Sequence, residues 1–143
     1  MRMDKLTIKS REALMEGHHL AQKSQHPDIL PLHLFSALLV QPEGTAPAIL
    51  QRLGVNLDQA KRQTEQALAR LPRVTGQANR NISSALSQVL EQSQSEADRL
   101  KDDYISVEHL LLALLGDRDG VGSLLRDLGV ERRGVEFLVA EQD

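Results

Sequence analysis

Three carboxylates lie close together in the second half of the chain, at Asp102, Asp103 and Glu108. Paired carboxylates can act as general acid and base where a pocket separates their pKa values, and no pattern in the sequence predicts such a pocket. A hydrated loop followed by an acid in the first turn of a helix also accounts for them, because the N-terminus of a helix favours negative charge. An enzyme that uses this cluster is therefore the third interpretation, behind two binding functions.

The five histidines offer little for metal chemistry. His18 and His19 are adjacent, so on a helix they point roughly 100° apart and do not converge on one ion. His33 and His109 lie in the two most apolar segments, and no further ligands can be located around them. We predict that each is a packed imidazole, bonded to the backbone or to a neighbouring helix cap, and that the chain binds no metal.

Motifs for nucleotide binding or hydrolysis are missing from the sequence. It contains neither GxxxxGK[ST] nor GxGxxG, and neither HExxH nor GxSxG. We therefore predict a non-catalytic binding domain without a cofactor of its own. If the parent protein uses ATP, the ATP site belongs to another part of that protein.

The composition excludes several classes of partner. The net charge is -3 and acidic and basic residues are interspersed, which argues against nucleic acid and membrane surfaces as partners. There is no cysteine, and the charged N-terminus has no apolar core of the kind found in signal peptides. A soluble, cytoplasmic protein is the expectation.

The sequence contains an internal duplication of one unit. Residues 29–39 realign with residues 105–115 after a shift of 76 positions, and beyond the next loop the shift becomes 75. Identical pairs at the first shift are Ile29 and Ile105, His33 and His109, Leu34 and Leu110, Ala37 and Ala113, Leu38 and Leu114, and Leu39 and Leu115. Those at the second shift are Leu50 and Leu125, Leu53 and Leu128, Gly54 and Gly129, and Val55 and Val130.

Apolar residues at helical spacing predict four helices in each copy and no strand. The helices should cover about 8–24, 31–40, 46–53 and 57–71, then about 84–101, 107–116, 121–128 and 131 onward. Expected N-caps are Thr7, Asn56, Ser83 and Ser106. The fold class is thus all-α, a pseudo-twofold duplicated four-helix repeat of about eight helices. We predict one domain over 1–143, made of repeat 1 (about 1–71), a connector (72–80) and repeat 2 (about 81–143).

Several stretches together resemble the Clp N-terminal domain, over essentially the whole chain. They are MetAspLysLeuThr (3–7), ProLeuHisLeuPheSerAlaLeuLeu (31–39) and TyrIleSerValGluHisLeuLeuLeuAlaLeuLeu (104–115). The connector LeuProArgValThrGly (71–76) is similar to that of the ClpB disaggregase type. The chain would then be a fragment, because the ATPase modules of that family are missing from it.

The resemblance implies a substrate-binding module of an ATP-dependent disaggregase. Unfolded or aggregated polypeptides would be its partners, and the module would help deliver them to the pore of the ATPase ring. The parent is expected to be a homohexamer that uses ATP and Mg and works with a DnaK-type chaperone system. The isolated domain is expected to be a monomer.

In ClpB-type domains a threonine, an aspartate and a glutamate beside an apolar groove are associated with substrate handling. By motif position these are Thr7, Asp102 and Glu108, and we add Tyr104 and Leu110 as substrate-binding candidates. Tyr104 could instead be a hydrophobic staple at a helix entry. Alanine at Asp102 or Glu108 should leave the fold nearly unchanged. The alternative function is docking of an adaptor protein, as in ClpA-type and ClpC-type unfoldases.

Overall fold

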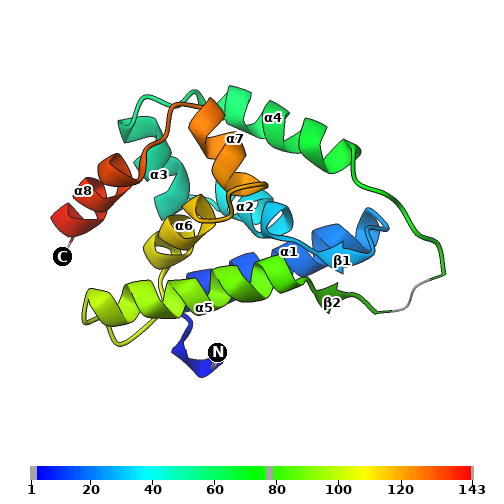
Figure 1. Cartoon of the computed structure of the whole chain (residues 1–143), viewed down its shortest axis with the longest axis horizontal. Helices are drawn as coiled ribbons and strands as arrows, with labels where there is room; N and C mark the ends of the chain where they lie inside the picture. The colour runs from blue at the N-terminus through cyan, green and yellow to red at the C-terminus, as the bar shows by residue number, and fades with distance from the viewer. Residues whose placement is uncertain (1–2, 77–78, 143) are drawn as a thin grey trace.

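The computed structural model describes residues 3–76 and 79–142, and these are mostly helical (Figure 1). The first copy contains a 3₁₀ turn (Met3–Lys5), α1 (Ile8–Lys23), β1 (Asp28–Ile29), α2 (Pro31–Leu39), α3 (Thr45–Arg52) and α4 (Leu57–Ala69). The second contains β2 (Asn81–Ile82), α5 (Ser84–Arg99), α6 (Val107–Leu115), α7 (Val121–Asp127) and α8 (Arg132–Gln142). The predicted duplicated, all-helical fold is confirmed, while the division into domain and connector stays a prediction.

Local signals start and stop the helices where the sequence predicts. The side chains of Thr7, Asn56 and Ser83 accept hydrogen bonds from backbone amides in the first turns of α1, α4 and α5. Gly54 and Gly129 follow α3 and α7 with the same positive φ of 85°, a conformation that glycine adopts without strain. Equivalent helices of the two copies therefore end in the same way.

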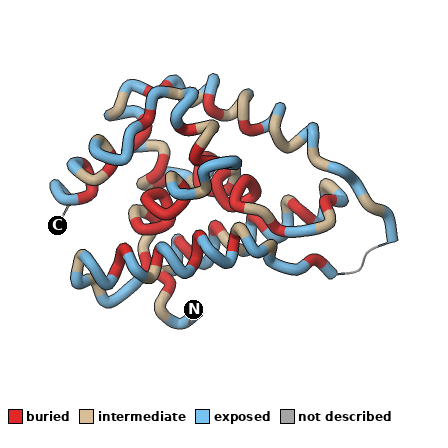
Figure 2. The backbone as a smooth tube through the Cα atoms, in the orientation of Figure 1, coloured by how far each residue is buried: buried red, intermediate tan, exposed pale blue. Residues whose placement is uncertain are grey.

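The two central helices, α2 and α6, form the middle of the molecule and are buried on nearly every side (Figure 2). α1 packs against α2, α5 packs against α6, and the two central helices pack against each other. The buried apolar residues of both copies consequently form one continuous core. No helix in the described part of the chain is both long enough and apolar enough to cross a bilayer.

Short backbone pairings join the two copies, and no pattern in the sequence predicts them. β1 pairs in parallel with β2, with Ile29 opposite Ile82, and Leu6 forms an isolated parallel bridge with Ile105. These pairings are equivalent under the repeat, since 29 and 105 differ by 76, as do 6 and 82. A two-residue strand is too short to show an alternation of apolar and polar residues. Its hydrogen-bond partner lies in the other copy, far away in the sequence.

His33 closes the start of α2 from within the core. Its Nδ1 accepts the backbone N–H of Leu30 at 2.9 Å, so the ring proton is on Nε2, which donates to Nδ1 of His26 at 2.8 Å. Burial, and then the neighbouring His26, lower the pKa of His33 to about 4. Burial, together with the cations Arg73 and Arg80, also lowers the pKa of His26.

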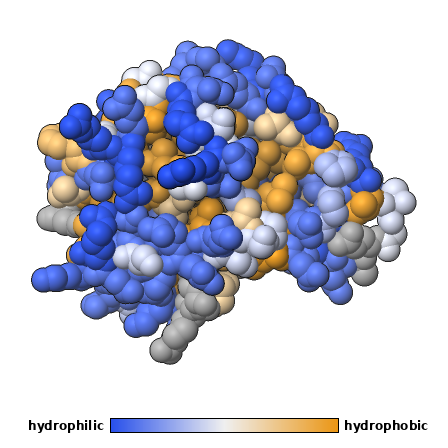
Figure 3. Space-filling view, viewed as in Figure 1, coloured by the Kyte–Doolittle hydropathy of each residue, from blue (hydrophilic) through white to orange (hydrophobic). Residues whose placement is uncertain are grey.

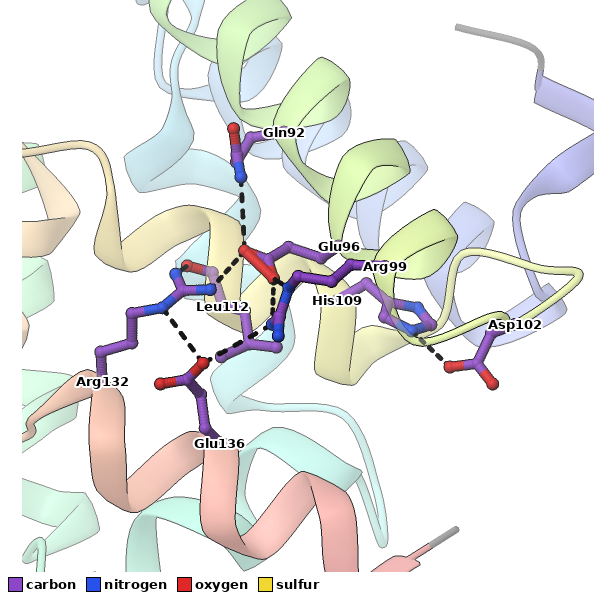
Figure 4. A network of polar contacts seen from close by, with 8 residues as sticks. All are labelled: Gln92, Glu96, Arg99, Asp102, His109, Leu112, Arg132 and Glu136. Atoms are coloured by element: carbon purple, nitrogen blue, oxygen red, sulfur yellow. Dashed lines mark hydrogen bonds and ion pairs between the residues drawn. The ribbon is translucent and has the colours of Figure 1, made fainter.

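A buried carboxylate ties α8 to α5 (Figure 4). Glu96 accepts hydrogen bonds from Arg99 at 2.7 Å, from Gln92 at 3.3 Å and from Arg132 at the start of α8. Burial alone would raise the pKa of Glu96, but these hydrogen bonds outweigh it and the pKa lies below its usual value. The equivalents of Glu96 and Arg132 in the first copy are the apolar residues Leu20 and Leu57.

Acidification should destabilise the fold through His33. The unfolded ring titrates near 6.5 and the folded ring near 4, so between these pH values only the unfolded chain binds the proton. The free energy of unfolding should therefore fall by on the order of 3 kcal/mol from pH 7 to pH 4. Urea unfolding at several pH values measures this fall. It should shrink in His33→Gln and persist in the exposed control His18→Gln; an unchanged slope in His33→Gln contradicts the assignment.

The Glu96 network can be tested by restoring the apolar pair of the first copy. Arg132→Leu alone should cost about 2 kcal/mol, because a buried carboxylate loses a charged partner. Glu96→Leu combined with Arg132→Leu should recover most of that loss. Chemical denaturation of both variants measures the coupling, and a double variant no more stable than Arg132→Leu would show that the network is not the cause.

Candidate functional site

Backbone hydrogen bonds hold the start of the chain against the loop between α5 and α6. Ile105 N–H donates to the carbonyl of Lys5 at 2.7 Å, and Thr7 N–H donates to the carbonyl of Ile105 at 3.0 Å. The buried hydroxyl of Ser10 donates to the same carbonyl at 3.0 Å. Residues 3–8 and 102–108, which are distant in sequence, therefore share one stretch of surface.

Three large apolar side chains are exposed on these two segments. Met3 is 54% exposed, Ile8 is 67% exposed and Tyr104 is 57% exposed. In the parallel bridge Leu6 and Ile105 both point into the core, so the residues on either side of them, including Tyr104, point outward. We call Met3, Ile8 and Tyr104, with the acidic residues Asp103 and Glu108 beside them, the Tyr104 surface.

The staple at the entry of α6 is made by residues other than Tyr104. Ser106 is the N-cap residue, so Ile105 and Leu110 occupy the two staple positions, and both are 0% exposed. Tyr104 is left on the surface, which favours a role in binding over a role in the staple. The prediction that Leu110 binds substrate is wrong, because its side chain lies in the core and cannot contact a substrate.

Asp102 has a structural partner that the sequence did not reveal. Its carboxylate accepts a hydrogen bond from Nε2 of His109 at 2.8 Å (Figure 4), while Nδ1 of His109 accepts the backbone N–H of Ser106 at 2.8 Å. The arrangement repeats that of His33, with Asp102 in the place of His26. Both copies thus place an acceptor at this position and only the second uses a carboxylate, which argues against the expectation that alanine at Asp102 leaves the fold nearly unchanged.

The remaining candidates divide by whether their polar groups are already occupied. The Thr7 hydroxyl lies at the site, but it already accepts the hydrogen bond of the Ser10 amide at 3.2 Å as the N-cap of α1. Asp103 is exposed and Glu108 half-buried, and within residues 3–76 and 79–142 neither forms an ion pair. The sequence analysis did not predict Met3 and Ile8 as site residues. The pattern that could have indicated them is a large apolar residue between polar neighbours.

No three histidine, aspartate or glutamate side chains come together as potential metal ligands in the described residues. The predicted roles of the two repeat-equivalent histidines are confirmed, since both rings bind backbone amides. Ser106 is the N-cap residue of α6, as predicted, and its hydroxyl also lies 3.1 Å from Nδ1 of His109. What the site offers a ligand is therefore an apolar surface with two free carboxylates.

Replacing the acceptor of His109 should cost stability. Asp102→Ala leaves a buried N–H without a partner, so the free energy of unfolding should fall by about 1–3 kcal/mol. Asp102→Asn keeps an acceptor oxygen and should lose less, and the exposed neighbour Asp103→Ala should change stability by less than about 0.5 kcal/mol. Urea denaturation of the three variants measures this order, and equal stability of Asp102→Ala and Asp103→Ala would rule it out.

Sequence comparison identifies relatives over nearly the whole chain. Residues 5–128 match the Clp repeat (R) N-terminal domain family. The chaperone protein ClpB of Bacillus cereus is 34% identical over 136 residues, which are 92% of this chain and 16% of that relative. ClpB of Corynebacterium diphtheriae is 37% identical over 125 residues, 86% of this chain and 15% of that relative. The chain thus spans about one sixth of the length of these relatives.

Solved structures with the same fold come from several members of this group. The Hsp104 N-terminal domain from Candida albicans has a TM-score of 0.83 at 21% identity, covering 93% of this chain and 87% of that one. The ClpV N-domain from Vibrio cholerae has a TM-score of 0.81 at 22% identity, covering 96% and 84%. At these identities the structures establish the fold alone. The chain belongs to the Clp repeat (R) N-terminal domain family, with ClpB chaperones among its relatives.

Proposed function

We propose that the chain is the N-terminal substrate-binding module of a ClpB-type disaggregase. Exposed apolar segments of unfolded or aggregated proteins bind transiently at the Tyr104 surface. The observation that carries the proposal is the exposure of Met3, Ile8 and Tyr104 on two segments held together by buried hydrogen bonds. Free apolar area on a rigid support gains energy when a nonpolar chain covers it.

The two acidic residues of the Tyr104 surface, Asp103 and Glu108, give it a preference for positively charged ligands. No basic residue in the described parts of the chain forms an ion pair with either carboxylate. A nonpolar segment flanked by lysine or arginine pairs with them, while one flanked by acids is repelled. Thr7 and Asp102 support this surface from their structural positions and are not its main contacts.

Weak binding suits a module of this kind. Several copies around one ring raise the effective concentration of substrate at the pore, so no single copy has to bind tightly. The homohexamer, the ATP and Mg of its ATPase modules, the DnaK-type partner and the cytoplasmic location all belong to the longer parent protein. They are part of the proposal through the ClpB relatives, of which the chain matches about one sixth.

Docking of a defined partner peptide, such as an adaptor segment, is the second candidate. One structural neighbour is a complex of the ClpV N-domain with VipB peptide, with a TM-score of 0.75 and 23% identity, covering 92% of this chain and 82% of that one. A folded adaptor or a specific peptide would bind where an unfolded protein would not. The two candidates therefore differ in whether a permanently unfolded polypeptide binds at all.

The test uses reduced, carboxymethylated α-lactalbumin as the unfolded polypeptide, with binding followed by fluorescence anisotropy. Wild type should bind it weakly, and Tyr104→Ser should weaken binding roughly fivefold, the equivalent of about 1 kcal/mol of lost contact. Carboxymethylation adds negative charge to this polypeptide, so Glu108→Gln should bind it at least as well as wild type and with less dependence on salt.

A matched control is Phe137→Ser, which removes an aromatic side chain that is 64% exposed on α8, outside the Tyr104 surface. It should bind like wild type. Equal loss in Phe137→Ser and Tyr104→Ser would mean that apolar surface in general, and not this site, holds the polypeptide. No binding by wild type would favour adaptor docking.

A further inference from the structure

A second surface lies between α2, α4 and α7, away from the Tyr104 surface. It is a groove of about 610 Å³ whose apolar lining includes Leu30, Ala67, Leu71 and Leu124. Figure 3 shows apolar side chains exposed on this face, in the region that α2, α4 and α7 occupy in Figure 1. The groove also has a pseudo-equivalent place beside α3 and α8, where the charged residues differ.

At the pseudo-equivalent position, α8 of the second copy lies beside α3 of the first. Arg52 on α3 forms an ion pair with Glu141 on α8 at 3.0 Å. Leu53 packs so tightly on Gly134 that a Cβ there would come within 2.9 Å of the leucine. A hollow of about 590 Å³ remains beside them, but the Arg52 that lines it is already paired.

Between α7 and α4, at the shift of 75, the residues of each of these contacts are changed. Arg52 corresponds to Asp127, Glu141 corresponds to Gln66, and Gly134 corresponds to Gln59. An aspartate facing a glutamine makes no ion pair, and a glutamine side chain prevents the close packing that glycine permits. Asp127 and Gln66 both line the groove, so the groove carries a carboxylate where the hollow beside α3 and α8 has an ion pair.

The wall of the groove formed around α7 is acidic. Asp117, Asp119 and Asp127 all line it, against one cation, Arg70, on the α4 side. Asp117 is occupied, because it accepts the backbone N–H of Val121 at 2.9 Å. Asp119 and Asp127 are exposed, and among the described residues neither has an ion-pair partner. A ligand that fits must therefore bring positive charge to this wall and apolar groups to the floor.

We propose that this groove is a second docking site, which binds a polypeptide segment of apolar side chains flanked by lysine or arginine. The apolar residues cover the floor, and the flanking cation pairs with Asp127 and Asp119. The incoming cation thereby forms with Asp127 the kind of ion pair that Arg52 forms with Glu141 between α3 and α8. This site is independent of the Tyr104 surface and of the function proposed for it.

The probe is a fluorescein-labelled peptide with a three-leucine centre and two arginines at each end. Wild type should bind it, and Asp119→Asn combined with Asp127→Asn should weaken binding at least fivefold. Gln66→Arg offers Asp127 an internal cation, so that the pair would match Arg52 and Glu141 with acid and base exchanged. It should abolish most of the binding. Circular dichroism and thermal unfolding confirm that each variant is folded.

Two controls distinguish binding in the groove from binding elsewhere on the protein. Glu12→Gln with Glu16→Gln removes the same charge from the exposed face of α1 and should bind like wild type. The groove pair is also measured in a Tyr104→Ser background, where the Tyr104 surface contributes less, and it should weaken the remaining binding at least fivefold. If the α1 pair weakens binding as much as the groove pair, net charge is responsible and the proposal falls. If only Tyr104→Ser weakens it, the peptide occupies the Tyr104 surface, which overturns the second site and leaves the proposed function intact.

Discussion

Each copy of this fold depends on one buried histidine that bonds two partners at once. The central helices are apolar on almost every side, so their first turns are inside the protein, where an unpaired amide is costly. His33 and His109 accept the backbone N–H of the N-cap residue through Nδ1 and donate through Nε2 to the loop before it. The histidine thus fixes the shape of that loop as well as the start of the helix.

The fixed loop is also the segment that joins the copies. Ile29 and Ile105 lie in these loops, and each pairs with the residues before the first helix of the opposite copy. The histidine, the loop and the pairing therefore form one continuous support across the pseudo-twofold axis. The Tyr104 surface lies on the outside of one of these supports, which is why a short exposed loop can present apolar side chains in a defined arrangement.

Duplication leaves the two copies free to differ wherever the support is unaffected. The acceptor for the histidine is His26 in one copy and Asp102 in the other, and both satisfy the same Nε2–H. Elsewhere the buried pair Glu96 and Arg132 replaces two leucines, and Asp127 stands where the other copy has Arg52. The first of these exchanges holds α8 to α5, and the second places a carboxylate in the groove between α4 and α7.

Sequence patterns were sufficient for what depends on local spacing. The helices, the caps at Thr7, Asn56 and Ser83, and the positive φ at Gly54 all follow from residues within a few positions of one another. The pairing of Leu6 with Ile105, the bond from His109 to Asp102 and the burial of Leu110 were missed. The first depends on how the copies meet, and the second on the shape of the loop between α5 and α6, which no helical spacing encodes.

The most direct test of the Tyr104 surface is an NMR titration of the assigned, isotope-labelled chain with unfolded α-lactalbumin. We predict that the largest amide shifts occur in residues 3–8 and 103–108, with small changes on the exposed face of α8. Shifts concentrated elsewhere, with those two segments unmoved at saturation, would contradict substrate binding at this surface.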